Sequence, residues 1–279
     1  FGPTDDVLAR IERREVPPPV WRWTDDTQMA AALVDSLDAH DGGIDEDDLM
    51  RTFADRFEMG RGYGPSMRDT LWAVRGGAAW RPLVNGAFGG RGSWGNGAAM
   101  RVAPLGAWYA GDPHRAATMA RVQARVTHAH YEAAEGAAAV AAAAAILAGP
   151  GTAPSRPELL AEVASLLESS EVRIRVVDAA RLDLPPGGLA ASREAAEVLG
   201  NGSDVSAPDT VPFALWCAAT YPDDLVETFW TTVAGLGDRD TTCAMACGVV
   251  AARVGAAGVP PEWAAAVEPL PQPSGRRRR

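Results

Sequence analysis

The chain has 279 residues, of which 47% are hydrophobic, and a formal net charge of −10. This length and composition allow a large core in one or two domains and exclude a globally disordered protein. The acidic balance argues against a general nucleic-acid binder, and the absence of lysine among its 26 basic residues excludes Schiff-base and P-loop lysine chemistry.

Apolar residues recur at helical spacing along most of the chain, and no segment alternates as a strand of a main sheet would. The pattern predicts helices over 27–39, 45–57, 65–75, 101–109, two helices within 113–148 broken near His128, and helices over 158–167, 193–199, 208–220, 225–233 and 241–256. Segment 76–97 is predicted to be a long connection. We therefore predict one all-α domain over 1–268, followed by a Pro/Arg-rich tail over 269–279.

The alanine-rich segment 133–148 is predicted to be a central, buried helix, because small side chains let helices pack closely. It is too short and too rich in alanine to be predicted as a membrane span. The three cysteines include no Cys-x-x-Cys pair, which is typical of core thiols in a cytoplasmic protein. We expect no membrane partner and a monomer.

Two short acidic clusters lie near opposite ends of the chain. Each combines aspartates with threonine and precedes an apolar, helix-like run: Trp23-Thr24-Asp25-Asp26-Thr27-Gln28 and Gly237-Asp238-Arg239-Asp240-Thr241-Thr242. Oxygen ligands at this density suit Mg²⁺, Mn²⁺ or Ca²⁺ better than zinc. If the fold joins the clusters, their carboxylates require cations, and a binuclear centre is the usual arrangement. The alternative is that each cluster only caps a helix.

A glycine-rich segment, 86–97, leads into a predicted helix. Its exposed backbone N–H groups would suit a phosphate, and its aromatic residues Phe88 and Trp94 could stack on a base. The pattern is neither a P-loop nor a dinucleotide-binding fingerprint, so a flexible surface loop is the alternative.

Two histidines, His128 and His130, lie where the alanine-rich helix is predicted to begin. No cysteine or carboxylate has the local spacing of a zinc site with them. We expect at least one to donate a hydrogen bond to a polar ligand in the pocket.

These motifs, in this order, resemble the ADP-ribosylglycohydrolase family. The resemblance rests on the two acidic clusters and on Gly60-Arg61-Gly62-Tyr63-Gly64, Gly95-Asn96-Gly97-Ala98-Ala99-Met100-Arg101-Val102-Ala103-Pro104-Leu105-Gly106, Thr127-His128 and the closing Gly255, Gly258, Pro260, Pro261 and Trp263. They span nearly the whole chain.

The resemblance implies an orthogonal bundle of helices with two Mg²⁺ ions at the base of a cleft, Mn²⁺ being a possible substitute. The implied metal ligands are Thr24, Asp25, Asp26, Asp238, Asp240 and Thr241. The implied substrate-binding residues are Gly92, Ser93, Trp94, Gly95, Asn96, Gly97, Met100 and His128, with the loop on the diphosphate of ADP-ribose and His128 near the distal ribose. An aromatic residue at the cleft would stack on the adenine.

Two positions depart from the family pattern. The opening helix is missing, with Phe1-Gly2 as its stub, so the place of a glutamate over the metals falls on Asp5 or Asp6. The late cluster has Arg239 where threonine is more usual.

The resulting hypothesis is metal-dependent hydrolysis of ADP-ribose linked to protein side chains. A carboxylate among Asp25, Asp26, Asp240 and Asp6 would accept or deliver the proton. The glycine-rich motif resembles the serine-type hydrolases more than the arginine-type ones. The alternatives are a non-catalytic ADP-ribose-binding regulator, a metal-dependent phosphohydrolase acting on a nucleotide diphosphate, and a helical interaction protein.

Overall fold

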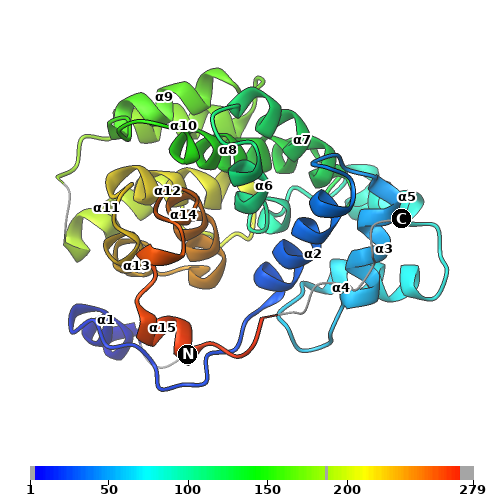
Figure 1. Cartoon of the computed structure of the whole chain (residues 1–279), viewed down its shortest axis with the longest axis horizontal. Coiled ribbons are helices and arrows are strands. Elements are labelled where there is room, and N and C mark those ends of the chain that lie inside the picture. Colours follow the sequence, from blue (N-terminus) through cyan, green and yellow to red (C-terminus); the bar gives the residue numbers. More distant parts are fainter. Residues whose placement is uncertain (1–3, 186–187, 271–279) are drawn as a thin grey trace.

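A computed structural model describes residues 4–185 and 188–270 of the chain, and these residues form an assembly of helices (Figure 1). In order, the helices are α1 (Thr4–Glu12), α2 (Asp25–Ala39), α3 (Glu46–Arg56), α4 (Pro65–Arg75), α5 (Trp80–Gly90), α6 (Ala103–Trp108), α7 (Pro113–Arg125), α8 (Tyr131–Ala148), α9 (Arg156–Ser165), α10 (Glu171–Arg181), α11 (Leu189–Leu199), α12 (Ala207–Thr220), α13 (Leu225–Ala234), α14 (Arg239–Val254) and α15 (Pro261–Ala266). Over the described ranges, extended pairing is limited to two isolated bridges, Trp21 with Val267 and Gly95 with Ser206. The all-α fold class is confirmed.

Helix α8 is the centre of the fold, as its composition predicts. It contacts α6, α7, α9, α10, α12 and α14, and most of its side chains are buried. Small residues set the spacing: a Cβ on Gly136 would lie 2.8 Å from the Cβ of Ala207 on α12, and one on Gly106 of α6 would lie 2.4 Å from the carbonyl oxygen of Ala141. By length and composition α8 could cross a membrane, but 83% of it is buried inside this fold.

Helices α2 and α14 contact each other next to α8, and their first turns lie close together. Helix α2 contacts α3, α6 and α14, and α14 also contacts α6, α8, α12 and α13. In Figure 1, α3, α4 and α5 lie beyond α2 on one side of the molecule, and α9 to α14 lie on the other side around α8. The two acidic clusters, more than two hundred residues apart in the sequence, therefore lie on adjacent helices.

Most predicted helices are present, with ends shifted by a few residues. The expected break near His128 lies between α7 and α8. Four helices were not predicted: α5, and α1, α10 and α15, of which α1 and α10 carry many charged residues and α15 is short.

The prediction of 76–97 as one connection is wrong, since α5 occupies its middle. Its backbone leaves the helical region at Ala87, Phe88 and Gly89. Helix α11 begins at Leu189, before the predicted start at Arg193.

The chain segments at both ends of the described range pair with each other. Trp21 N–H donates to the Ala266 carbonyl at 2.7 Å, and Trp23 Nε1 donates to the Pro269 carbonyl at 3.1 Å. Most of the predicted tail, 271–279, and the stub at residues 1–3 lie outside the described residues. The division into a domain over 1–268 and a tail stays a prediction.

Candidate active site

The two acidic clusters form the starts of α2 and α14, but their side chains do not act as helix caps. Thr24 and Asp238 are the residues that precede α2 and α14, and neither side chain makes a capping hydrogen bond. The Thr24 hydroxyl instead donates to Oδ2 of Asp26 at 2.6 Å. Side-chain capping therefore explains neither Thr24 nor Asp238, although Asp25, Asp26 and Asp240 do lie in first turns, where the helix dipole favours acids.

The carboxylates of the two clusters lie close enough to repel one another. Burial, with the nearby charges of Asp26, Asp240 and Asp238, raises the pKa of Asp25 to about 7. Burial, with the charges of Asp240 and Asp238, raises the pKa of Asp26 to about 6 despite the Thr24 hydrogen bond. Desolvation and Asp240 also raise the pKa of Asp238. Such an arrangement calls for positive charge.

The donor set fits hard divalent cations. Oδ1 of Asp26 is buried and has no hydrogen-bond partner within the described residues, so it is available as a ligand. The other available oxygens are carboxylates and threonine hydroxyls, which suit Mg²⁺ or Mn²⁺. No three carboxylate, histidine or cysteine side chains of the described ranges are already gathered at metal-ligand spacing. The clusters thus contain suitable ligand atoms for a metal ion, but these atoms are not yet gathered around one position.

A tight turn before α4 supports the first cluster. The carbonyl of Arg61 accepts from the Asp25 N–H at 2.7 Å. Gly62 has φ +102°, and a Cβ there would lie 2.9 Å from Oδ1 of Asp25. Only glycine combines this backbone conformation with such a close approach. The Arg61 guanidinium lies over the Trp23 ring at 3.3 Å and pairs with Glu268, which ties the turn to the C-terminal segment.

The glycine-rich loop is an ordered structure packed on the turn before α8, so the flexible-loop alternative is not supported. Gly92 has φ +74°, and a Cβ there would lie 2.7 Å from both the Cβ of Ala129 and the N of His130. The Ser93 hydroxyl accepts from the Gly95 N–H at 3.2 Å, and the Ser93 carbonyl accepts from the His130 N–H at 3.3 Å. The Trp94 carbonyl accepts from the Ala207 N–H at 2.9 Å.

Asn96 joins this loop to the second acidic cluster. Its side chain is buried, and Nδ2 donates to Oδ2 of Asp238 at 2.9 Å and to the Thr210 hydroxyl at 3.1 Å. The fold thus brings the predicted phosphate loop and the predicted metal ligands into one site.

The histidines have different surroundings. His130 precedes α8, where its Nδ1 accepts from the Glu132 N–H at 3.2 Å, so it is a helix cap. His128 is buried beneath the loop, with Nδ1 2.7 Å from the Thr127 hydroxyl. A Cβ on Gly97 would lie 3.1 Å from Nε2 of His128, so this nitrogen faces the loop.

Burial of His128 predicts a specific acid sensitivity. Desolvation and the charge of Arg101 lower its pKa from 6.5 to about 3, so below pH 6.5 the unfolded chain binds a proton that the folded chain does not. The free energy of unfolding should therefore fall by about 2 kcal/mol between about pH 7.5 and about pH 5 through this residue alone. Urea titrations should show a smaller fall in His128→Gln. His114→Gln, an exposed position on α7, should behave as wild type; equal pH dependence in both variants would contradict the assignment.

Two aromatic rings of the loop region are exposed. The Trp94 side chain is 52% exposed and packs edge-on against His130 at 5.8 Å between ring centroids. Phe88 is 57% exposed and has φ +53°, a conformation rare for a bulky residue and frequent at binding sites. Both rings are available for stacking.

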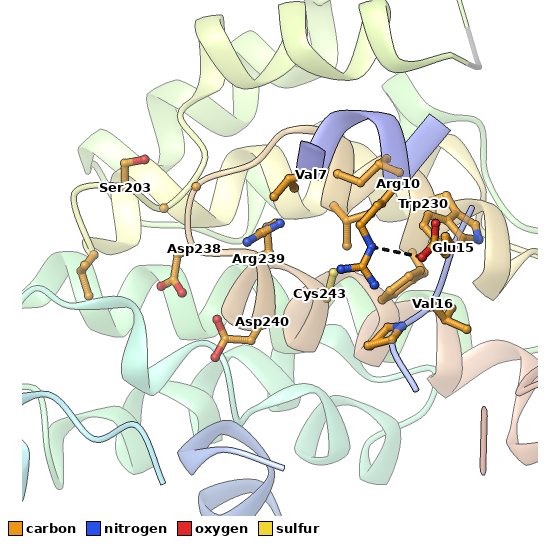
Figure 2. Close-up of a pocket in the computed structure, with 17 residues that line it drawn as sticks. Val7, Arg10, Glu15, Val16, Ser203, Trp230, Asp238, Arg239, Asp240 and Cys243 are labelled. Atoms are coloured by element: carbon orange, nitrogen blue, oxygen red, sulfur yellow. Dashed lines mark ion pairs between the residues drawn. The ribbon is translucent and has the colours of Figure 1, made fainter. Parts of the chain in front are cut away.

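A cavity of about 960 Å³ opens beside the second cluster (Figure 2). Asp238 and Asp240 lie together at one end, and the other end is lined by Trp230 and Val16 and by the ion pair of Arg10 with Glu15. Arg239, the departure from the family pattern, lies on the wall between them.

The remaining predicted site residues differ in placement. Thr241 is buried beside Asp238, to which its hydroxyl hydrogen bonds. Met100 is part of the main core. Asp6 is exposed on α1, and no hydrogen bond or ion pair found among the described residues joins it to the acidic clusters; the Asp5 side chain lies outside the description. The catalytic assignment of Asp6 stays a prediction.

Sequence reasoning gave no role to several polar residues that hold the site together. They are Gln123, Thr210 and Glu268, together with Arg61, Arg101 and Thr127, which were quoted only as parts of motifs. Each of them has a partner at least 22 residues away, and the pair of Glu268 with Trp23 is 245 residues apart. For Arg61 and Arg101 the available signal was their position inside glycine-containing motifs.

Known proteins are similar to this chain in sequence and in fold. A profile of the ADP-ribosylglycohydrolase family matches residues 2–277. The chain belongs to this family. It is 31% identical to ADP-ribosylhydrolase ARH3 of Bos taurus over 271 residues, which cover 86% of this chain and 73% of the relative. It is 30% identical to ADP-ribosylhydrolase ARH3 of Homo sapiens, with 86% and 73% covered.

A solved structure agrees with the sequence relatives. The fold matches a chain of an ADP-ribosylglycohydrolase-related protein complex with a TM-score of 0.63 and 27% identity, over 90% of this chain and 77% of that one. As a member of the ADP-ribosylglycohydrolase family, the protein is a hydrolase of glycosidic bonds that removes ADP-ribose. The family is metal-dependent in general.

Proposed function

We propose that this ADP-ribosylglycohydrolase releases ADP-ribose from modified protein side chains, with serine-linked ADP-ribose preferred over arginine-linked ADP-ribose, and that it uses two Mg²⁺ ions, which Mn²⁺ can replace. The observation that carries the proposal is the meeting of two uncapped acidic clusters, one with an unpartnered buried oxygen on Asp26, beside an ordered glycine-rich loop. The serine preference rests on the resemblance of the segment 92–101 to the serine-type hydrolases.

The metal ligands in this proposal come from both clusters. They are Thr24, Asp25, Asp26, Asp238, Asp240 and Thr241. When bound, divalent cations supply positive charge that orients hydroxyl groups and lowers the pKa of a coordinated water. Hydrogen bonds from Asn96 and from the Thr241 hydroxyl hold the carboxylate of Asp238 in one orientation.

The protein's own groups divide the remaining work. Asp25, Asp26 or Asp240 accepts the proton of the attacking water or delivers one to the departing side-chain oxygen. His128 contacts the ribose from beneath the loop. The N–H groups of Gly92, Gly95 and Asn96 already donate within the protein, to Ala87, Ser93 and Val205, so the diphosphate is bound by the other N–H groups of the loop. This arrangement holds the anomeric carbon in line with the water, which lowers the barrier by reducing the entropy lost in the reaction.

Trp94 is the proposed stacking partner of the adenine, and the exposed Phe88 ring is a second candidate. Trp94→Ala should raise the Kd for ADP-ribose about tenfold, since stacking of a base on an aromatic ring contributes about 1–3 kcal/mol. Calorimetric titration measures this directly. Trp72→Ala, a similarly exposed tryptophan on α4, is the matched control and should leave the Kd unchanged. Unchanged binding in Trp94→Ala would assign the adenine elsewhere.

The test of the proposed function uses one serine-linked and one arginine-linked ADP-ribosyl peptide, each with Mg²⁺, with Mn²⁺ and with EDTA. Mass spectrometry should find free ADP-ribose from the serine-linked peptide in the metal-containing samples alone. Release from the arginine-linked peptide alone would reverse the proposed preference, and release in EDTA would contradict the metal centre.

The same samples separate the alternatives. Release of AMP would identify a nucleotide-diphosphate phosphohydrolase. Binding of ADP-ribose with no product from either peptide would favour a regulator.

A further inference from the structure

Arg101 is a buried cation without a carboxylate partner. Its side chain is 0% exposed, and none of the ion pairs found among the described residues includes it. Its guanidinium lies over the Phe53 ring at 4.6 Å. A charge in such surroundings is costly, so its retention calls for a function beyond packing.

The guanidinium donates to neutral oxygens of three segments: the loop, the end of α7 and the turn before α8. Nε donates to the Gln123 side chain at 2.8 Å, and Nη1 donates to the Gly97 carbonyl at 3.2 Å. Nη2 donates to the Gln123 carbonyl at 3.1 Å and to the Thr127 hydroxyl at 2.8 Å. Gln123 in turn donates to the Ala98 carbonyl at 3.0 Å. Arg101 thus connects residues 97–98 of the loop to Thr127.

The direction of these bonds decides which nitrogen of His128 carries hydrogen. Arginine only donates, so the Thr127 oxygen accepts from Arg101. The hydroxyl hydrogen then has one acceptor among the described residues, Nδ1 of His128 at 2.7 Å. If Nδ1 carried the hydrogen instead, the buried hydroxyl would have no acceptor, which is unfavourable. Nδ1 is therefore the acceptor, and the neutral ring has its hydrogen on Nε2.

Nε2 faces space that only glycine leaves free. A Cβ at Gly97 would lie 3.1 Å from it, and one at Gly95 would lie 3.3 Å from it. Within the described ranges no hydrogen bond joins Nε2 to the protein. A donor held in this position is suited to an acceptor oxygen of a ligand in the loop, either a ribose oxygen or a phosphate oxygen.

We infer that Arg101 is a positioning residue: through Thr127 it holds His128 as a neutral Nε2–H donor to an oxygen of bound ADP-ribose, while its bond to Gly97 keeps the loop at the matching distance. The inference rests on the proposed function for the identity of the ligand. A neutral donor also avoids repulsion of cations at the adjacent acidic clusters.

The test combines NMR of the histidine rings with binding of ADP-ribose. The chain has four histidines, so long-range ¹H–¹⁵N spectra at neutral pH resolve each ring, and loss of one set in His128→Gln assigns it. Wild type should show the Nε2–H form of His128. Thr127→Val, which keeps the shape and removes the hydroxyl, should show a mixture of tautomers and bind ADP-ribose about tenfold more weakly.

Two further variants distinguish positioning from packing. Thr127→Ser restores the hydroxyl and should restore both the tautomer and the affinity. Thr52→Val is the matched control, since the hydroxyl of this buried threonine donates to the Asp48 carbonyl of its own helix and to no other group among the described residues, and it should leave both unchanged. Arg101→Met removes the donors to Thr127 and, if it folds, should show the same tautomers and affinity as Thr127→Val. If Arg101→Met does not fold, the result for Thr127→Val alone tests the inference.

An Nδ1–H ring in wild type, or wild-type tautomer and affinity in Thr127→Val, would overturn the inference. Wild type with an Nε2–H ring that does not bind ADP-ribose would contradict the proposed function and the donor role together. The relay itself would then still be decided by the spectrum of Thr127→Val.

Discussion

Replacing Asp25 or Asp240 with asparagine should lower the rate of ADP-ribose release by about a thousandfold or more, the scale of losing a preorganised charge from an active site. Both residues are proposed to hold metal and to handle the proton of the attacking water. Asparagine keeps the shape and a single oxygen, so the loss reports on charge. Turnover measured with saturating serine-linked peptide and Mg²⁺ checks the prediction.

Replacing Asp25 with asparagine should also stabilise the metal-free protein against unfolding. The pKa of Asp25 is raised from 3.8 to about 7, so its contribution to folding is favourable below pH 3.8 and is lost as the pH rises through 7. At about pH 8 in EDTA, Asp25→Asn should therefore unfold with a free energy about 2 kcal/mol higher than wild type.

Added Mg²⁺ should stabilise wild type in thermal unfolding and have little effect on Asp25→Asn, because ligand binding to the folded state raises the free energy of unfolding. Asp69→Asn, whose side chain is 74% exposed beside Arg68, is the control for removal of an acid. Full activity in Asp25→Asn would contradict the proposed mechanism. Equal Mg²⁺ stabilisation of wild type and Asp25→Asn would place the metal elsewhere.

Gly106→Ala should be among the most destabilising single-methyl additions to this chain, with a loss of about 3 kcal/mol in the free energy of unfolding. A Cβ at this position would lie 2.4 Å from the Ala141 carbonyl oxygen and 2.6 Å from the Ala144 Cβ. Neither neighbour is the end of a flexible side chain, so helix α6 has to move away from α8. The midpoint of urea unfolding measures the loss.

Gly86→Ala is the matched control for this substitution. It also adds a methyl group to a helical glycine, but a Cβ at position 86 meets nothing within 4 Å. Alanine should there stabilise the protein by about 0.5–1 kcal/mol, because it lowers the entropy of the unfolded chain. Equal effects at both positions would show that the contact of α6 with α8 is not tight.

The sequence alone was enough to predict most helices and the central place of α8. Hydrophobic spacing and small residues are local properties that do not depend on the partners of a helix. The family resemblance also rested on local motifs, and the comparisons confirmed it. Helix α5 was missed because glycine and proline around it indicate a loop, although Trp80–Gly90 finds neighbours in α4.

Whether the acidic clusters were caps or parts of one site was decided by the tertiary structure. Local sequence at 24–26 and 238–241 is compatible with either, since an N-terminal helical turn favours acids in both cases. The contact of α2 with α14 places their carboxylates near one another, and Asn96 bonds to Asp238 across 142 residues.

The direction of individual hydrogen bonds also depends on the tertiary structure. Thr127 and His128 are neighbours in sequence, but the direction of their hydrogen bond follows from Arg101, which lies 26 residues from Thr127. Residue types and spacing determined the family and the chemistry of this protein, because both rest on local patterns. Packing decided which atoms meet, which groups lose water and which nitrogen holds a proton, because these depend on distances between segments remote in the chain.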